Sequence, residues 1–212
     1  MKRVQSPFGY PSIQLGEYTT SKYEIIDLIK SWVALSIAFS ILYNRGFSIE
    51  QVFFVTMGFS AVTVGIAFIL HELAHKIAAQ RYGCSAEFKS ADSMLLLAIA
   101  MSFFGFIFFA PGAVMISGPV GVKRSGIIAA AGPATNFGLA IIFLMLMMYT
   151  EGISSGLTLF FSFGAMINTW IGLFNMIPFW VFDGKKIITW SKPVYFSMVG
   201  IGVLLFFARG LL

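Results

Sequence analysis

Two histidines four residues apart lie in the apolar stretch "IAFILHELAHKIAAQ", residues 66–80. They are His71 and His75, the only histidines in the chain, and Glu72 directly follows the first of them. On a helix, residues four apart share one face, so both imidazoles can bind a single metal ion. The pattern HExxH is typical of zinc sites in which the glutamate acts as a general base. The sequence therefore predicts a zinc site at His71 and His75, with Glu72 beside it.

The alternative interpretation of this motif is a pair of hydrogen-bonded structural histidines packed between helices. Insertion scales give a cost of about 2.5–3.5 kcal/mol for a charged residue at the middle of a bilayer. A bound zinc ion contributes on the order of 10 kcal/mol, which more than offsets that cost. The comparison favours metal binding.

A catalytic zinc ion usually has three protein ligands and one position left for water. After Glu87, the acidic candidates downstream of the motif are Asp92, Glu151 and Asp183. Asp92 follows a polar stretch and Glu151 lies in the short loop "MYTEGISSG", so both are expected at the solvated surface. Asp183 ends the long apolar segment "LFNMIPFWVFDGKK", where we expect Pro178 and Gly184 to break the helix and turn the carboxylate inward. An ordinary Asp-Gly turn at a helix end is the alternative.

The segments that must position these residues are strongly apolar. Of the 212 residues 58% are hydrophobic and 11% are charged, whereas about 25% are charged in an ordinary soluble domain. Several apolar runs approach the roughly 20 residues that a helix needs to cross a bilayer. A soluble core built by this chain is too small to bury all of them. The sequence predicts an all-α integral membrane protein with five or six transmembrane helices. The runs are 26–43, 51–80, 93–110, 125–149, 157–182 and 193–211.

Two further blocks follow the histidine motif. The first is "AAGPATN", which contains Gly132, Pro133 and Asn136, and the second runs from Asn175 to Gly184 and contains Asp183. With HELAH, and in this order, these blocks closely resemble the site-2 protease family of intramembrane zinc metalloproteases. The resemblance covers roughly residues 50–190 and is nearest to the compact prokaryotic or archaeal members.

The resemblance implies the roles of the site residues. One zinc ion per chain is expected, with His71, His75 and Asp183 as its ligands and Glu72 as the general base. The implied reaction is hydrolysis of peptide bonds within or near transmembrane segments of other membrane proteins. The residues implied in substrate binding are Gly132, Pro133, Asn136 and Asn175. For either asparagine, a hydrogen bond that only bridges two helices is the alternative.

Metal binding constrains the membrane topology. If His75 and Asp183 share one ion, they lie at the same depth in the membrane. Because each lies at the carboxyl end of its apolar segment, the two segments run in the same direction. One of the two apolar runs between them therefore does not cross the membrane. With the amino terminus inside and 93–110 returning to its own side, 12 Lys and Arg residues are inside and 2 are outside. With six full crossings, 8 Lys and Arg residues would be inside and 6 outside. The positive-inside rule therefore favours five spans, a re-entrant 93–110 segment, and a zinc site nearer the cytoplasmic face of the cell membrane.

The remaining stretches add few elements. Residues 1–23 are expected to form a cytoplasmic tail, and residues 24–212 a single transmembrane metalloprotease domain. The stretch "GAVMIS", 112–117, is expected to form a short membrane-associated strand whose open edge could pair with an unwound substrate, with an ordinary connector as the alternative. The basic residues are scattered over loops, so no nucleic-acid partner is expected. The oligomeric state and the role of Cys84, the single cysteine, stay open.

Three other functions agree with part of the sequence. A divalent-metal transporter would also bind a cation through His and Asp side chains between helices. It needs no general base beside the histidines, and it needs polar residues along several helices, whereas these segments are almost uniformly apolar. A second class of membrane HExxH protease takes a downstream glutamate as its third ligand, but Glu151 lies on the opposite membrane face in this topology. A non-catalytic scaffold does not explain the intact ligand set.

Overall fold

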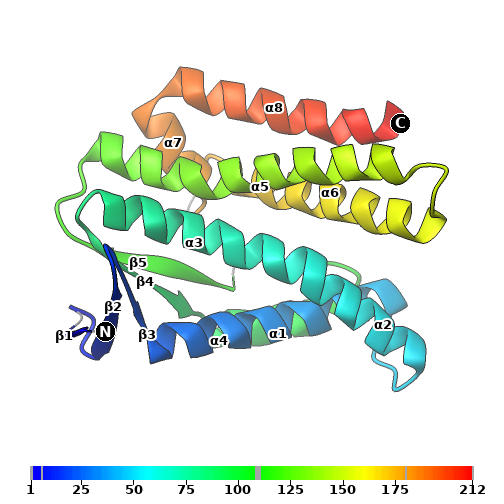
Figure 1. Ribbon diagram of the computed structural model, residues 1–212, viewed down its shortest axis with the longest axis horizontal. Coiled ribbons are helices and arrows are strands. Elements are labelled where there is room, and N and C mark those ends of the chain that lie inside the picture. Colours follow the sequence, from blue (N-terminus) through cyan, green and yellow to red (C-terminus); the bar gives the residue numbers. More distant parts are fainter. Residues whose placement is uncertain (1, 6, 108–110, 180, 212) are drawn as a thin grey trace. The chain divides into compact units, whose positions relative to one another are not determined.

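In the computed structural model the chain is mostly helical (Figure 1). The structure describes residues 2–5, 7–107, 111–179 and 181–211. The chain forms two compact units, one made of residues 1–72 and 79–119 and the other of residues 73–78 and 120–212.

The long helices of the first unit begin and end where the local sequence predicts. Helix α1 (Lys22–Asn44) starts after Ser21, whose side chain accepts a hydrogen bond from the Glu24 N–H, and ends at Arg45 in the left-handed conformation. Helix α2 (Gln51–Ser60) continues through a π-helical turn, η1 (Ala61–Gly65), into α3 (Ile66–Arg81). These three elements form one apolar helix of 31 residues, which corresponds to the predicted 51–80 run.

The stretch expected to be an amino-terminal tail contains a small antiparallel sheet. Its strands are β1 (Lys2–Gln5), β2 (Pro11–Leu15) and β3 (Tyr18–Ser21), in that order. The turn between β2 and β3 contains Gly16 at a positive φ of 64°. A sheet of this kind was not expected from the sequence, since each strand is short and only partly apolar.

Two side chains of longer helices hold the strands of the first unit. The Gln80 amide, at the end of α3, donates hydrogen bonds of 3.0 Å to the carbonyls of Thr19 and Ala86. The Glu24 carboxylate, in α1, accepts a 3.0 Å hydrogen bond from the Phe88 N–H. These bonds satisfy the backbone carbonyl of Ala86 and the N–H of Phe88, which are both buried residues of the first unit.

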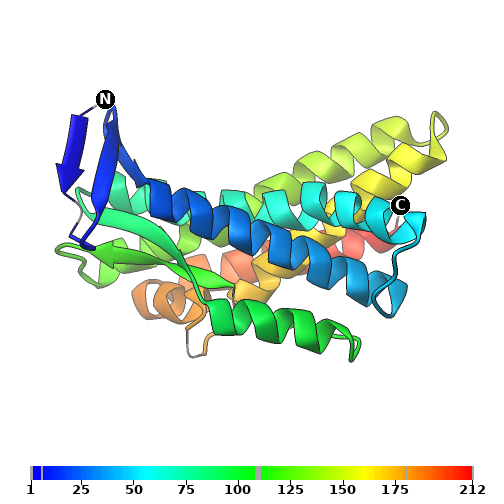
Figure 2. The ribbon, with the colours of Figure 1, turned by 90° about the horizontal axis from the view of Figure 1, so that it is seen from below.

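A two-stranded sheet closes the base of the predicted re-entrant segment (Figure 2). Strand β4 (Ser85–Ser90) pairs antiparallel with β5 (Gly112–Ser117), so the strand expected at 112–117 is confirmed. Ser90 lies opposite Gly112, and the next residue, Ala91, donates a 2.9 Å hydrogen bond to the Pro111 carbonyl. The chain between them leaves the sheet and returns to the same edge.

Helix α4 (Asp92–Ser102) occupies the outgoing part of that segment. It has 11 residues, which span about 16 Å, roughly half of the 30 Å hydrocarbon core. Residues 108–110, at the end of the predicted 93–110 run, lie outside the described residues. A helix this short, between two ends paired with each other, supports the prediction that the segment does not cross.

The second unit is helical. Helices α5 (Val122–Thr150) and α6 (Ser155–Asn175) pack side by side, and α7 (Asp183–Trp190) and α8 (Lys192–Leu211) pack on them (Figure 1). Glycine allows the closest approaches, because a Cβ on Gly126 would overlap the Trp190 side chain. The core is apolar and includes Phe137, Met176, Ile187 and Tyr195.

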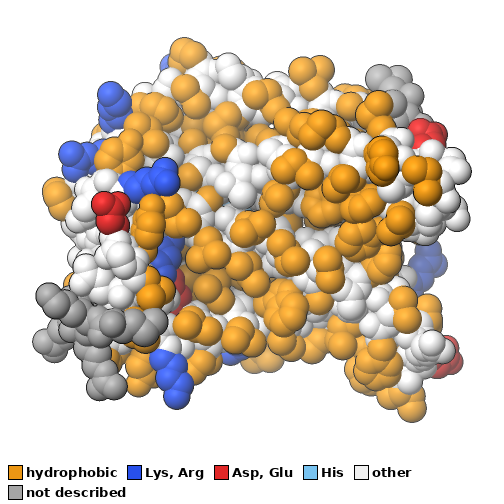
Figure 3. Space-filling view, in the orientation of Figure 1, with side chains coloured by type: hydrophobic (Ala, Val, Ile, Leu, Met, Phe, Trp, Pro, Cys, Tyr) orange, Lys and Arg blue, Asp and Glu red, His pale blue; other side chains and the backbone are white. Residues whose placement is uncertain are grey.

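Among the described residues, length and composition identify four helices able to cross a membrane. They are α1, the continuous α2–α3 helix, α5 and α6. The expected fifth span coincides with α8, whose described apolar part, Lys192–Ala208, is shorter than these four helices, so its crossing stays a prediction. Large hydrophobic side chains cover much of the face seen in Figure 3, and Tyr149 and Leu204 are both more than 70% exposed. The predicted class, an all-α membrane protein, is confirmed.

Candidate metal centre

Helix α3 carries the two histidines on one face. His71 and His75 are buried, and so is Glu72 between them. Because one helical turn separates the histidines, their rings follow each other along the same side of α3. The local helix prediction for the HExxH motif is therefore confirmed.

The third residue of the centre begins a separate short helix. Asp183 is the first residue of α7, after α6 has ended at Asn175 and the chain has passed Pro178. The expected role of Gly184 as a helix breaker is wrong, because Gly184 lies inside α7. A Cβ there would overlap the Met176 backbone carbonyl, so glycine lets the start of α7 approach the preceding loop closely.

The three side chains converge. Asp183 Oδ2 lies 3.0 Å from His75 Nε2, and the ligand atoms offered by His71, His75 and Asp183 all lie within 4.8 Å of one another. Ligands about 2.0–2.2 Å from a tetrahedral zinc ion are about 3.4 Å apart. The donor set and its spacing therefore fit a zinc ion with three protein ligands.

A backbone carbonyl orients one of the rings. The carbonyl of Ile128, in α5, lies 2.8 Å from His75 Nδ1. A proton on Nδ1 then donates to this carbonyl and leaves the Nε2 lone pair for a metal, an arrangement common around zinc-bound histidines. Pro133 lies inside α5 and has no N–H to give to the Ala129 carbonyl, so the helical hydrogen bonding is interrupted beside Ile128.

The predicted substrate-binding residues lie on two helices of the second unit. Gly132, Pro133 and Asn136 are buried in α5. The Asn136 amide donates a 3.1 Å hydrogen bond to Asn168 Oδ1 in α6, and both asparagines are fully buried. Asn175 ends α6, and its amide donates a 2.9 Å hydrogen bond to the Ile171 carbonyl. Their part in substrate binding stays a prediction.

Sequence reasoning missed Asn168 and the Ile128 carbonyl. A signal for Asn168 did exist, because an amide inside the apolar run 157–182 requires a polar partner. The pairing of Asn136 with Asn168 matches the helix-bridging alternative, since this hydrogen bond joins α5 to α6, while the Asn168 amide donates to the Gly164 carbonyl.

The other acidic candidates lie at the surface. Asp92 is 68% exposed and accepts hydrogen bonds from Lys30 (2.6 Å) and Ser90 (2.8 Å). These two bonds, the stronger from Lys30, hold the pKa of Asp92 below its ordinary value. Glu151 is exposed in the turn after α5. Neither belongs to the metal-ligand cluster, as predicted.

Two proteins of similar sequence are named as putative zinc metalloproteases. The chain is 38% identical over 188 residues to a protein of Methanocaldococcus jannaschii named "Putative zinc metalloprotease MJ0611", covering 87% of this chain and 92% of that protein. It is 30% identical over 149 residues to Bacillus subtilis "Putative zinc metalloprotease YwhC", covering 62% of this chain and 68% of that protein. The chain belongs to this zinc metalloprotease family. The family resemblance drawn from the three sequence blocks is thereby confirmed.

No family model and no solved structure matches the chain. Membership of a zinc metalloprotease family explains why two imidazoles and one carboxylate lie together in an apolar protein. Three protein ligands leave a fourth position of a tetrahedral ion for water, as catalytic zinc sites require.

Proposed function

We propose that this metalloprotease is an intramembrane enzyme, which binds one zinc ion and hydrolyses peptide bonds within or near transmembrane segments of other membrane proteins. The observation that carries the proposal is the cluster of His71, His75 and Asp183. Its histidines lie on a helix that is apolar enough to cross a membrane, and all three ligands are buried. A site at that depth is suited to substrates that are themselves in the membrane.

The chain's own residues supply proton transfer and orientation. A zinc ion held by the three ligands would act as a Lewis acid and make water nucleophilic near neutral pH. Glu72 directly follows a ligand and is buried at 9% exposure. It accepts the proton of the attacking water and then passes a proton to the leaving amine. The Ile128 carbonyl keeps the His75 ring in the required orientation throughout.

The substrate must unwind before it is cut, because a helix engages its peptide groups in its own hydrogen bonds. Strand β5 offers a place for the extended segment. In the part of the chain that the structure describes, β5 pairs with β4 alone, so its second edge has no neighbouring strand. An extended peptide can bind such an edge through main-chain hydrogen bonds, with specificity from alternate side chains.

The charges of the second unit support a site near the cytoplasmic face. Basic residues gather where α5 begins, in α7, and where α8 begins, and α7 packs on α5. The positive-inside rule favours a cytoplasmic location for that end. Ile128, which contacts His75, lies six residues from the start of α5, about 9 Å along the helix. These basic residues are Lys123, Arg124, Lys185, Lys186 and Lys192.

The test is the Glu72→Gln variant, with Glu50→Gln as a matched control at an exposed position. Each purified protein is loaded with zinc and offered a panel of single-span membrane proteins in vesicles. We expect Glu72→Gln to retain zinc and lose cleavage by about 100- to 10,000-fold, and Glu50→Gln to keep both. Equal cleavage by the two variants would contradict the proposal. Metal flux into vesicles without cleavage would identify a transporter.

A further inference from the structure

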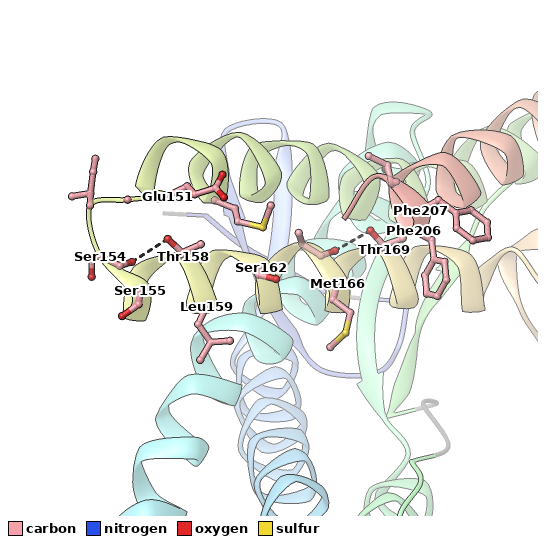
Figure 4. Close-up of a pocket in the computed structure, with 15 residues that line it drawn as sticks. Glu151, Ser154, Ser155, Thr158, Leu159, Ser162, Met166, Thr169, Phe206 and Phe207 are labelled. Atoms are coloured by element: carbon pink, nitrogen blue, oxygen red, sulfur yellow. Dashed lines mark hydrogen bonds between the residues drawn. The ribbon is translucent and has the colours of Figure 1, made fainter. Parts of the chain in front are cut away.

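The second unit contains a large hollow away from the metal ligands. Its volume is about 990 Å³, and it lies between the end of α5, the turn 151–154, one side of α6, and residues 205–207 of α8 (Figure 4). None of the metal ligands lines it. This volume is at the upper end of the range for small-molecule sites, about 300–1,000 Å³, so the hollow can hold a molecule much larger than an ion.

The lining of this groove changes from polar to apolar along α6. Glu151, Ser155 and Thr158 line one end, whereas Met166 and Phe206 line the other (Figure 4). Glu151 is the one charged residue among the described residues that line it. A ligand that fits is therefore amphipathic, with a cationic or hydrogen-bonding head and an apolar body.

The hydroxyl groups in the groove do not make its floor strongly polar. Thr158 Oγ1 lies within hydrogen-bond distance of the Ser154 carbonyl (3.0 Å), to which it can donate, and of Thr150 Oγ1 (3.2 Å). Thr169 Oγ1 donates to the Ala165 carbonyl (2.9 Å). Because these hydroxyls are satisfied within the protein, the groove can accept an aliphatic chain without leaving them unpaired.

The length of the groove matches one leaflet of a bilayer. From Ser155 to Thr169 the α6 helix rises about 21 Å, starting at the turn between α5 and α6. One leaflet, from the middle of the bilayer through its headgroup region, is about 20–22 Å thick. A groove of this length, with a charge at one end only, suits a lipid tail with its headgroup at the surface. A transmembrane helix would need contacts through the whole thickness.

We propose that this groove binds one membrane lipid with an ammonium headgroup. The acyl chain lies along α6 toward Phe206, and the ammonium group lies beside the Glu151 carboxylate. An ammonium group that bears N–H donors can both pair with the carboxylate and donate hydrogen bonds to it. The same helix, α6, ends shortly before Asp183, so the bound lipid braces the unit that holds this residue.

The first test compares Ser162→Trp, which fills the groove, with Leu157→Trp, an exposed position on α6 outside it. Both proteins are reconstituted with equal amounts of dioleoyl phosphatidylethanolamine and phosphatidylglycerol, extracted in mild detergent, and examined by native mass spectrometry. We expect the control to retain one phosphatidylethanolamine and Ser162→Trp to lose it by roughly tenfold or more, since apolar contacts are blocked. Equal lipid retention by the two variants would overturn the proposal.

Two further measurements keep the test independent of folding. Glu151→Gln changes only a surface carboxylate, and we expect it to retain lipid but lose the preference for phosphatidylethanolamine. An unchanged preference would contradict the assigned headgroup contact. A photo-crosslinking residue at position 162, irradiated in native membranes, should attach to lipid. Attachment to another protein or to a second copy of this chain would instead identify the groove as a docking site for a helix.

Discussion

The imidazole of His75 has a partner at each ring nitrogen. Nε2 faces Asp183 and Nδ1 faces the Ile128 carbonyl, so ring rotation is restricted from both sides. Sequence analysis could predict the two histidines, because their relation is local to one helix. It could predict Asp183 from its place at the end of an apolar segment and from the family motif, but it could not predict Ile128. A backbone carbonyl acts regardless of side-chain type, and therefore leaves no trace in the sequence.

The position of Asp183 depends on the missing side chain at Gly184. In Gly184→Ala the new Cβ would overlap the Met176 carbonyl, so the start of α7 must shift and the carboxylate with it. We expect zinc affinity to fall about 10- to 100-fold, as for other groups that orient metal ligands. Competition with a chromogenic chelator measures this change. Gly138→Ala, in α5, is the control, because a Cβ there has open space. Equal affinities for the two variants would contradict the prediction.

The π-helical turn is the main irregularity of the helix that carries the motif. The Trp32 indole, in α1, donates a 2.8 Å hydrogen bond to the Ala61 carbonyl, and its ring occupies the space where a Cβ of Gly65 would be. A π turn carries an extra residue, so it changes the angular position of the residues that follow it in α3. The sequence predicted one span over 51–80. It could not predict this turn, because the turn depends on a side chain from another helix.

Gly65→Ala tests that contact. The added methyl group would overlap the Trp32 ring, and we expect a destabilisation of about 1–3 kcal/mol, typical of overpacking. Gly58→Ala is the control one to two turns earlier, where a Cβ meets nothing, and we expect it to be neutral or slightly stabilising. Thermal unfolding of the zinc-loaded proteins in detergent measures both.

A double-mutant cycle gives the specific readout for this pair. Trp32→Ala removes the ring, so the cost of Gly65→Ala should be smaller in that background than in the wild-type protein. Additive effects of the two substitutions would show that Gly65 is sensitive for another reason.

At the scale of the molecule, composition correctly predicted the fold class, whereas the number of crossings, argued from charge and metal geometry, stays a prediction. The short sheets were harder to predict from the sequence. Strand β5 was expected, whereas β1, β2, β3 and β4 were not; the distant residue Gln80 donates hydrogen bonds to β3 and β4. Amphipathic periodicity, the usual signal for strands, is weak over four or five residues.

Cysteine labelling tests the topology. In a Cys84→Ala background, single cysteines replace Asp92, Val122 or Ile153, all of which are exposed. We expect a membrane-impermeant maleimide to label positions 92 and 122 from the cytoplasmic side and position 153 from the other side, because the 91–111 segment returns to its own end. Labelling of 92 and 122 from opposite sides would show that this segment crosses.

The lengths of two helices connect the enzyme to the thickness of its membrane. The continuous helix from Gln51 to Arg81 has 31 residues and α5 has 29, so they are about 46 Å and 43 Å long. Both exceed a 30 Å hydrocarbon core, so they must tilt or project into the headgroup region. Since the histidines and the Ile128 carbonyl lie on these two helices, a thicker bilayer should draw the reacting groups farther from bulk water. Turnover should therefore vary with lipid chain length even where every protein contact is unchanged.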